Sequence, residues 1–312
     1  MGVGALNNIS VIVSTYTERR LSDVLQCLDS LDKQTLRPSE ILLVLDPIDK
    51  LVEFYRSRIP PNVKVIISDG IGLSYARNAG VRNSLGDIIA FIDDDAVADK
   101  RWLESSIENY EDDQVIGVGG QISAQWEDKR PMWFPEELDW IVGCSYKGMP
   151  QKRSEIRNPI GCNMSFRKTV FERAGYFRTD IGRLGDKLLC SEETELAIRA
   201  FEAIPGSRIV FEPSAIVSHK VGKKRESLKY VWTRSVNEGM SKATISHKPD
   251  SSEMLSTEDS YLKFLLSFAI PSRIKRIYRI SQASQLFVLL LSILAVFAGF
   301  VRVRIMKVIR RS

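Results

Sequence analysis

Four short apolar runs, rich in β-branched residues, alternate with helix-spaced segments in the first third of this 312-residue chain. The runs are Ile9–Val13, Ile41–Leu45, Val63–Ile67 and Ile88–Ile92. Continuous apolar runs of this length are typical of strands buried on both faces of a parallel sheet. Leucines at helical spacing from Leu21 onward and the segment Leu73–Ser84 predict helices between the runs. The alternation therefore predicts an α/β fold, with helices flanking a mostly parallel, doubly wound sheet.

Polar side chains follow each of these strands. They are Thr15, Tyr16, Asp46, Asp69, Asp93, Asp94 and Asp95. In open α/β sheets, ligands bind in the crevice beyond the carboxyl ends of the strands. The position of these side chains therefore predicts a binding site at that edge of the sheet.

The triple aspartate is the most distinctive of these groups. Asp93 and Asp95, two residues apart in extended chain, project to the same side. Hard oxygen ligands of this kind suit Mg²⁺ or Mn²⁺, which proteins commonly share with substrate phosphates. The alternative is an Asp-rich turn that caps the helix after Asp99. A turn alone gains nothing from three adjacent like charges, so the metal interpretation is favoured.

Two other motifs have competing interpretations. The segment Gly70–Tyr75 resembles a dinucleotide-binding glycine motif, but Tyr75 replaces the third glycine and the segment follows the third strand. A nicotinamide-dependent oxidoreductase is therefore disfavoured, and there is no Walker A sequence. Ser191 precedes the acidic pair Glu192 and Glu193 at a predicted helix start. They suit either a helix cap or a general base kept ionised by the helix dipole, and both interpretations stay open.

The charge distribution is asymmetric. The chain has 44 Lys and Arg against 39 Asp and Glu, a net charge of +5. Ten basic residues and no acidic ones follow Asp259, so the preceding body carries a net charge of −5. A mildly acidic body predicts no binding to nucleic acid.

Cysteine and histidine usage excludes several classes of site. The four cysteines are Cys27, Cys144, Cys162 and Cys190. Because they are scattered and form no C-x-x-C pair, they predict neither a disulfide framework nor a structural zinc site, and they suit a reducing compartment. With only two histidines, the chain has no polyhistidine metal site.

The C-terminal tail predicts membrane attachment. No residue from Ile280 to Val301 is charged, and as a helix this stretch spans about 33 Å, enough to cross a bilayer core. Both flanks, Arg273–Arg279 and Arg302–Arg311, are basic, and basic flanks favour the cytoplasmic side. A single span cannot keep both flanks on the cytoplasmic side, whereas an interfacial helix can. The single span and the interfacial helix both stay open as arrangements. Leu262–Ile270 is a shorter apolar stretch that Pro271 ends; Met1–Asn8 predicts no signal peptide.

Several sequence blocks, in order, resemble the family 2 glycosyltransferases, which have the GT-A fold. They are Ile9–Tyr16, Asp46, Gly72–Gly80, Phe91–Asp95, Asn163–Arg167 and Glu192–Arg199. Val217–Val221 and Arg234–Gly239 resemble C-terminal blocks of some members. The layout, with Trp133-Phe-Pro and one C-terminal apolar segment, looks like the archaeal glucuronosyltransferases that extend dolichyl-phosphate-linked glucose in N-glycosylation.

This resemblance implies inverting, metal-dependent transfer of a sugar from a nucleotide-diphosphate donor. The implied donor-binding residues are Thr15, Tyr16, Glu18, Asp46, Asp69, Arg77, Asp93 and Asp94. The implied ligands of Mn²⁺ or Mg²⁺ are Asp95, Asp93 and His219. The family's catalytic base is usually an aspartate, and Glu193 stands at that position here, so Glu192 stays an alternative. His219 and Arg234 also have structural interpretations, as a core histidine and a surface ion pair.

The predicted organisation is a GT-A domain over residues 1–245, a linker with a basic amphipathic segment over 246–279, and a membrane segment over 280–312. Residues 1–120 form its nucleotide-sugar half and 121–245 its acceptor half. Aromatic residues of Trp126–Trp140 either contact sugar or membrane, or pack over the sheet. The predicted partners are a nucleotide sugar, a lipid-linked saccharide and the cytoplasmic face of a cell membrane. A surface-polysaccharide transferase and a non-catalytic membrane scaffold are the rival hypotheses.

Overall fold

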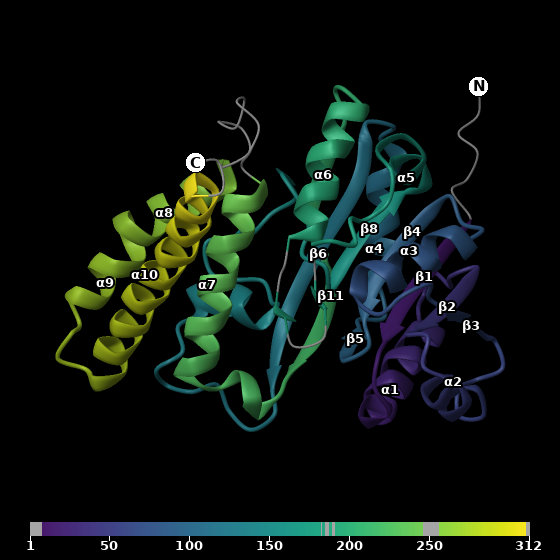
Figure 1. The fold of residues 1–312 in the computed structure, drawn as a ribbon, viewed down its shortest axis with the longest axis horizontal. Helices are drawn as coiled ribbons and strands as arrows, with labels where there is room; N and C mark the ends of the chain where they lie inside the picture. Colours follow the sequence, from purple (N-terminus) through teal and green to yellow (C-terminus); the bar gives the residue numbers. More distant parts are fainter. Residues whose placement is uncertain (1–7, 182, 185–186, 189–190, 246–255, 310–312) are drawn as a thin grey trace. The chain divides into compact units, whose positions relative to one another are not determined.

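The computed structural model describes residues 8–181, 183–184, 187–188, 191–245 and 256–309, which form two compact units (Figure 1). Unit 1 combines Met1–Ser123, Pro150–Lys187 and Glu192–His219. Unit 2 combines Ala124–Met149, Leu188–Ser191 and Lys220–Ser312. Each unit thus gathers stretches that are distant in sequence, and the predicted functional boundaries at 120, 245 and 279 stay predictions.

The first half of the unit 1 sheet is parallel, as predicted. Its strands are β1 (Ile9–Thr15), β2 (Glu40–Leu45), β3 (Val63–Ile67) and β4 (Ile88–Asp93), in the order β3-β2-β1-β4. The chain leaves β1 toward β2 on one side, while β4 pairs on its other side. The carboxyl ends of β1 and β4 therefore flank a topological switch point, where open sheets bind ligands.

The second half of the sheet is antiparallel, so the sheet is mixed rather than parallel throughout. β4 pairs with β8 (Asn163–Arg167), and β8 pairs with β6 (Val115–Trp126). Next come β11 (Arg208–Val221), β5 (Ala96–Ala98) and β7 (Ser154–Ile156). β9 (Arg183–Leu184) and β10 (Lys187–Leu188) form a short separate ladder.

Helices cover the unit 1 sheet. They are α1 (Leu21–Asp32), α2 (Asp49–Arg56), α3 (Leu73–Asn83), α4 (Trp102–Ile107), α5 (Lys168–Ala174) and α6 (Glu192–Ala203). The short 3₁₀ helices η1 (Glu18–Arg20) and η2 (Glu108–Glu111) complete the unit. The core beneath them is aromatic: Phe91 meets Phe177 edge to face at 5.6 Å, and Phe171 packs against both. A Cβ on Gly80 would lie 2.7 Å from Ile12, so this glycine lets α3 approach β1 closely.

Unit 2 is mainly helical. Its elements are η3 (Glu136–Val142), η4 (Lys223–Arg225), α7 (Leu228–Ile245), α8 (Ser256–Phe264), the π-helical turn η6 (Leu265–Ala269), α9 (Ile270–Ile274) and α10 (Ile280–Ile309). Pro271, which follows the apolar stretch Leu262–Ile270, lies in the first turn of α9, directly after the π-helical turn η6.

The helices α7 and α10 lie in backbone contact. A Cβ on Gly239 would lie 1.9 Å from the Val296 carbonyl oxygen, and one on Gly299 would lie 2.0 Å from that of Val236. The Ser235 and Ser292 hydroxyls share a buried hydrogen bond of 2.9 Å in the same interface. Small residues that permit such close approach are typical of helix pairs in or near membranes.

The opposite face of α10 is apolar and exposed. Its exposed large side chains recur at helical spacing and are Ile280, Phe287, Leu290, Leu294, Phe297 and Ile305. Among the described helices, Ile280–Met306 alone is long and apolar enough to cross a membrane. We call this row of side chains the apolar stripe of α10.

The tryptophans of the 126–140 segment pack within unit 2. Trp126 and Trp133 both contact the ring of Phe134, at 5.1 and 5.7 Å. The indole N–H of Trp140 donates to the Tyr261 hydroxyl at 3.2 Å. These contacts favour the packing interpretation of the segment.

Candidate active site

The three aspartates occupy different environments. Asp93 ends β4 and is about one-third exposed, whereas the side chains of Asp94 and Asp95 are buried. Arg20, from η1, forms ion pairs with both, at 3.1 Å from Asp95 Oδ2. Arg20 also lies over the Tyr16 ring, 5.4 Å from its centre. The buried pair of acids is thus balanced by one arginine, and Asp93 is left facing outward.

Asp94 has the most perturbed acidity of the site. Burial raises its pKa from 3.8 to about 7, Arg20 acts against this shift, and the neighbouring Asp95 adds to it. Burial acts on Asp46 in the same direction, against the hydrogen bond from the Gly72 N–H. Both carboxyls are held where desolvation disfavours their charge.

His219 brings the antiparallel half of the sheet to the aspartates. It lies on β11 opposite Ala96 of β5, and its Nε2 is 3.2 Å from Asp95 Oδ1. One ligand atom each from Asp93, Cys162 and His219 all lie within 4.8 Å of one another. Carboxylate oxygens with an imidazole nitrogen form a donor set that suits Mn²⁺, and the thiol adds a softer donor at the edge. The residues present therefore fit a divalent cation.

Arg77 and Glu192 form a buried ion pair beside the aspartates. Arg77 Nη1 is 2.9 Å from Glu192 Oε1, and Nη2 donates to the Gly161 carbonyl at 3.0 Å. Nη2 also lies 3.9 Å from Asp93 Oδ1. The close approach requires glycine at 161, since a Cβ there would meet Arg77 Nη2 at 2.6 Å. Arg77 thus links α3, the first turn of α6 and the end of β4.

Glu193 occupies the first turn of α6 beside this pair. It is half-buried, whereas Glu192 is buried and engaged by Arg77. Ser191, which precedes them, has a φ of 83°, a left-handed value that non-glycine residues rarely adopt. It therefore lacks the extended conformation of most capping serines.

Asp46 and Gly72 join the ends of β2 and β3 to the start of α3. The Gly72 N–H donates to Asp46 Oδ1 at 3.2 Å, and Gly72 has a φ of 121°, which favours glycine. Thr15, the last residue of β1, is buried. It pairs with Leu45, which directly precedes Asp46. Thr15 and Asp46 thus lie at adjacent strand ends, as the strand pattern predicts.

Two residues that are predicted to bind the donor, Asp69 and Glu18, form ion pairs in the structure, and their role stays a prediction. Asp69 is exposed and pairs with Arg82 on α3. Glu18, in η1, lies 3.5 Å from Lys50 Nζ. Arg234 pairs with Glu238 on α7 at 3.2 Å, in unit 2. These contacts give each side chain a structural partner.

Three positions at the site were not predicted. Arg20 and Cys162 reach the aspartates only through the fold, although Cys162 directly precedes the Asn163–Arg167 block. Asn163 donates to the carbonyls of Gln121 and Ala215 and accepts from the Trp102 indole at 2.7 Å. Asn163 therefore links its own strand β8 to β6 and β11. Cys27, Cys144 and Cys162 are buried free thiols, and Cys190 lies outside the described residues.

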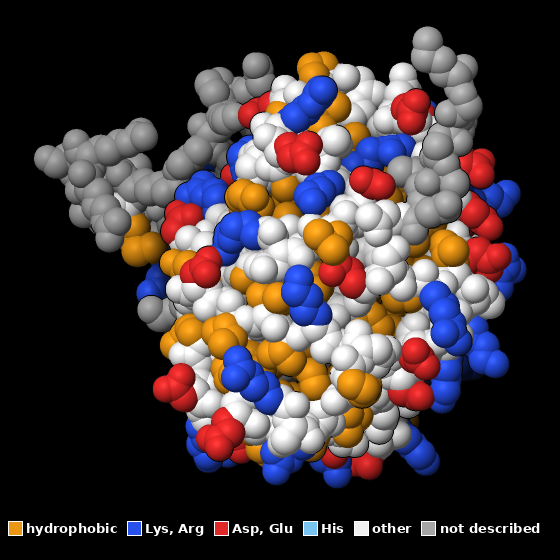
Figure 2. All heavy atoms as spheres, turned by 90° about the vertical axis from the view of Figure 1, so that its right-hand side faces the viewer, with side chains coloured by type: hydrophobic (Ala, Val, Ile, Leu, Met, Phe, Trp, Pro, Cys, Tyr) orange, Lys and Arg blue, Asp and Glu red, His pale blue; other side chains and the backbone are white. Residues whose placement is uncertain are grey.

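The surface of the N-terminal strands and helices has mixed charge. On the described part of the face in Figure 2, Lys and Arg side chains alternate with Asp and Glu. Such a surface lacks the single basic footprint of most nucleic-acid-binding domains. The absence of a nucleic-acid partner stays a prediction.

The family match and the similar proteins of known name agree with one another. The family described as Glycosyl transferase family 2 matches residues 10–175. A glucosyl-dolichyl phosphate glucuronosyltransferase of Haloferax volcanii is 31% identical over 274 residues, covering 86% of each chain. The succinoglycan biosynthesis protein ExoM of Rhizobium meliloti is 25% identical and covers 74% of this chain and 73% of that protein.

Solved structures share the fold. The mannosyltransferase PcManGT of Pyrobaculum calidifontis, solved with GDP-Man and Mn²⁺, aligns with a TM-score of 0.61 at 18% identity. The alignment covers 94% of this chain and 87% of that one. The S. aureus protein TarS, residues 1–349, solved with UDP-GlcNAc, aligns with a TM-score of 0.51 over 93% and 81%. The chain has the GT-A fold and belongs to glycosyltransferase family 2.

Proposed function

We propose that this glycosyltransferase is an inverting, metal-dependent enzyme that extends a sugar carried on a polyprenyl phosphate lipid, using a nucleotide-diphosphate sugar as donor. The acidic cluster Asp93–Asp95 with His219, beside the Arg77–Glu192 pair and Glu193, is the observation that carries the proposal. The best-matched donor is UDP-glucuronate, because the Haloferax relative is named for glucuronosyl transfer to glucosyl-dolichyl phosphate.

Thr15 and Asp46 bind the base and ribose of the donor. Both are buried at neighbouring strand ends, the edge of the sheet at which open α/β folds bind their ligands. Arg77 directs its guanidinium toward Asp93, so a donor phosphate near Asp93 gains a cationic partner. Tyr16 contributes its exposed ring beside Arg20.

Asp95, Asp93 and His219 hold the divalent cation. When bound, it neutralises the charge that develops on the departing diphosphate. Asp95 lies between Arg20 and His219, with Oδ2 3.1 Å from Arg20 and Oδ1 3.2 Å from His219 Nε2, so both neighbours fix the orientation of its carboxylate.

Glu193 is the general base. Glu192 is buried and engaged by Arg77, so its carboxylate is committed to positioning, whereas Glu193 is half-buried on the same helical turn. Glu193 takes the proton of the acceptor hydroxyl as that oxygen displaces the diphosphate at the anomeric carbon. A single in-line displacement of this kind inverts the anomeric configuration.

The apolar stripe of α10 attaches the enzyme to a membrane, and α10 lies in the interface rather than across the bilayer. Arg234, Glu238 and Lys242 on α7 flank Gly239, which contacts the middle of α10. A spanning α10 would carry these charges toward the bilayer centre, where each is costly. An interfacial helix keeps both basic flanks on the cytoplasmic side.

A donor panel tests this function. Purified full-length chain in detergent is incubated with Mn²⁺, a polyprenyl phosphoglucose and one radiolabelled donor: UDP-glucuronate, UDP-glucose or GDP-mannose. We expect label from UDP-glucuronate in the organic-extractable lipid, with UDP release, and loss of both in Asp95→Asn.

Three outcomes would contradict parts of the proposal. Label that enters only water-soluble polysaccharide supports a surface-polysaccharide transferase, a role suggested by the name of the succinoglycan relative. Donor binding without nucleotide release from any donor supports the non-catalytic scaffold. Retained turnover in Asp95→Asn removes this carboxylate from the metal site.

A further inference from the structure

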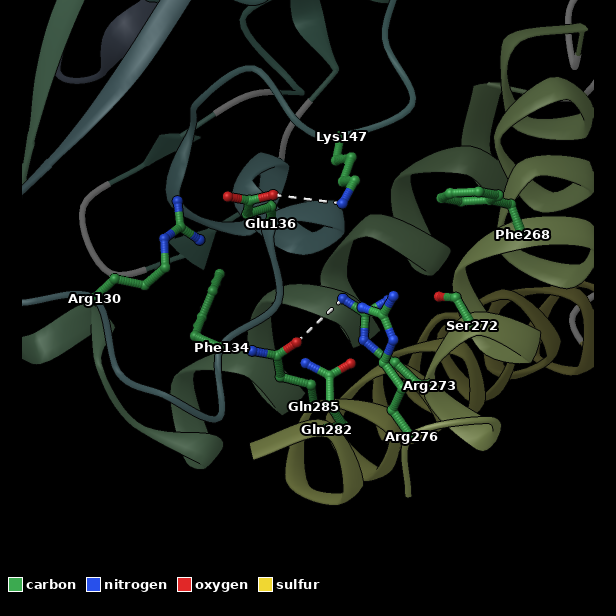
Figure 3. Close-up of a pocket in the computed structure, with 10 residues that line it drawn as sticks. All are labelled: Arg130, Phe134, Glu136, Lys147, Phe268, Ser272, Arg273, Arg276, Gln282 and Gln285. Carbon is green, nitrogen blue, oxygen red and sulfur yellow. Dashed lines mark hydrogen bonds and ion pairs between the residues drawn. The ribbon is translucent and has the colours of Figure 1, made fainter. Parts of the chain in front are cut away.

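Unit 2 contains a pocket of about 340 Å³ that is lined by cationic side chains. Figure 3 shows Arg130, Lys147, Arg273 and Arg276 around it, with Phe268 and Gln285. All of these residues belong to unit 2, and none of them is assigned a role in sugar transfer above.

Two of the arginines are fixed by buried carboxylates. Arg273 is bidentate to Glu137, at 3.0 and 2.6 Å, and Arg130 is bidentate to Asp139, at 2.7 Å for both bonds. The Arg273 Nε–H is buried and finds no acceptor among the residues that the structure describes. The Ala269 carbonyl and the Gln285 side chain accept from the remaining Nη–H groups of Arg273, so Nε–H is its one donor left over among the described residues.

The other two cations are exposed and available to a ligand. Lys147 Nζ lies 3.7 Å from Glu136, a loose surface pair. Among the described residues, no hydrogen bond or ion pair engages the Arg276 guanidinium. Four cations and three carboxylates leave the pocket region with an excess of one positive charge.

The start of α10 adds to this preference for an anion. Gln282 and Gln285, which line the pocket, lie in its first two turns. The N-terminus of a long helix carries the positive end of the helix dipole, which stabilises a nearby negative group. Gln285 is held by Arg273 and by the Met132 carbonyl, so its amide is fixed in the wall.

Apolar side chains continue from the pocket over the surface. Phe268 lines it and is about half exposed, and Leu266, Ile277 and Ile280 on the neighbouring turns are also exposed. A small inorganic anion gains nothing from this surface, whereas an amphiphile with an anionic head gains both contacts. The phosphate of a lipid, as a monoester or a diester, carries at least the one negative charge that balances the pocket.

We propose that this pocket binds the phosphate of a polyprenyl-phosphate lipid, whose hydrocarbon chain follows the exposed apolar residues of η6 and α10. Arg276 and Lys147 contact the phosphate oxygens, and Arg273 and Arg130 hold the wall in shape. The inference rests on the proposed function only in naming this lipid as the sugar acceptor.

Binding of a short prenyl phosphate tests the site. Citronellyl phosphate, citronellol and inorganic phosphate are titrated into the full chain in detergent by calorimetry. We expect citronellyl phosphate to bind more tightly than either of the other two. Arg276→Gln and Lys147→Gln should each weaken its binding by about tenfold. Lys275→Gln, an exposed neighbour outside the lining, should change it less than twofold.

Three results would overturn the inference. Equal binding of citronellol removes the phosphate contact, and equal binding of inorganic phosphate removes the lipid. Equal weakening by Lys275→Gln and Arg276→Gln reduces the effect to general surface attraction. Because the titration contains no donor, its failure leaves the donor panel untouched. If the donor panel fails while the titration gives the expected result, only the proposed transfer reaction is overturned, and the lipid-phosphate site stands.

Discussion

Each unit contains a buried Arg–Glu pair that joins distant parts of the chain, and the neighbours of the two pairs differ in charge. Arg77–Glu192 in unit 1 lies beside Asp93, within a cluster of carboxylates. Arg273–Glu137 in unit 2 lies among other cations. A buried pair is nearly neutral by itself and mainly fixes geometry. The preference of each region therefore depends on the side chains around the pair. The carboxylates in unit 1 favour a bound cation, and the cations in unit 2 favour a bound anion.

Because we propose the sugar transfer in unit 1 alone, Glu193→Gln is the strongest test of the comparison. Removing the proposed general base should lower kcat by about 10²–10⁴-fold, while donor affinity stays unchanged. Glu193→Asp should recover part of the rate, since family members usually have aspartate there. Steady-state UDP release measures both variants. A full rate in Glu193→Gln would transfer the role to Glu192.

The two pairs should contribute similarly to stability. Arg77→Met and Arg273→Met each leave a buried carboxylate unpaired, which costs about 3–5 kcal/mol of unfolding free energy. Urea unfolding followed by tryptophan fluorescence measures the loss. The matched double variants Arg77→Met/Glu192→Leu and Arg273→Met/Glu137→Leu should recover most of it. A loss below 1 kcal/mol for either single variant would show that the pair is not buried as described.

The acidity of Asp94 should make unit 1 less stable at neutral pH than at mildly acidic pH. Burial raises its pKa from 3.8, the ordinary value of an aspartate, to about 7 in the folded chain, so the folded state retains a proton that the unfolded state loses. Without divalent cation, the unfolding free energy should therefore fall as pH rises from 4 to 7. Asp94→Asn, which stays neutral, should flatten this slope. An unchanged slope would assign the titration to another group.

Among these variants, Cys162→Ser should have the smallest effect on the enzyme with bound Mn²⁺. The Cys162 thiol borders Asp93 and His219, and soft donors favour soft metals over Mn²⁺. Cys162→Ser should weaken Cd²⁺ binding by about tenfold and change Mn²⁺ binding by less than about threefold. Calorimetry gives both affinities, and ultraviolet absorbance of the Cd–thiolate bond gives an independent reading. Equal Cd²⁺ affinity in both proteins would place the thiol outside the site.

The parallel half of the sheet could be predicted because each strand is a continuous apolar run with a polar residue at its end. Thr15, Asp46 and Asp93 were located by the same signal. The antiparallel half could not be predicted, because β8, β6 and β11 are joined by long connections rather than hairpin turns. The apolar run of the last strand in the sequence, Arg208–Phe211, ends shortly before Pro213. β11 continues past it because its partner changes from β7 to β5.

Long-range pairing explains what the sequence concealed at the two sites. Arg20 lies 74 positions from Asp94, and Arg273 lies 136 positions from Glu137, so no local pattern joins them. The proposed division of roles between Glu192 and Glu193 rests on the ion pair of Arg77 with Glu192, which no local pattern predicts. Residue type predicted which groups are present, and the fold decided which ones meet.

The backbone contact between Gly239 and Val296 has a practical consequence for protein production. Deleting the chain from Ile280 onward removes the contacts that α10 makes with Ser235, Val236 and Gly239 of α7. A shortened protein of this kind loses the apolar stripe of α10 but exposes the side of α7 that packed against α10, so it gains no solubility. Replacing exposed residues such as Leu294 and Phe297 with polar ones, while keeping both helices, is the better route to a detergent-free enzyme.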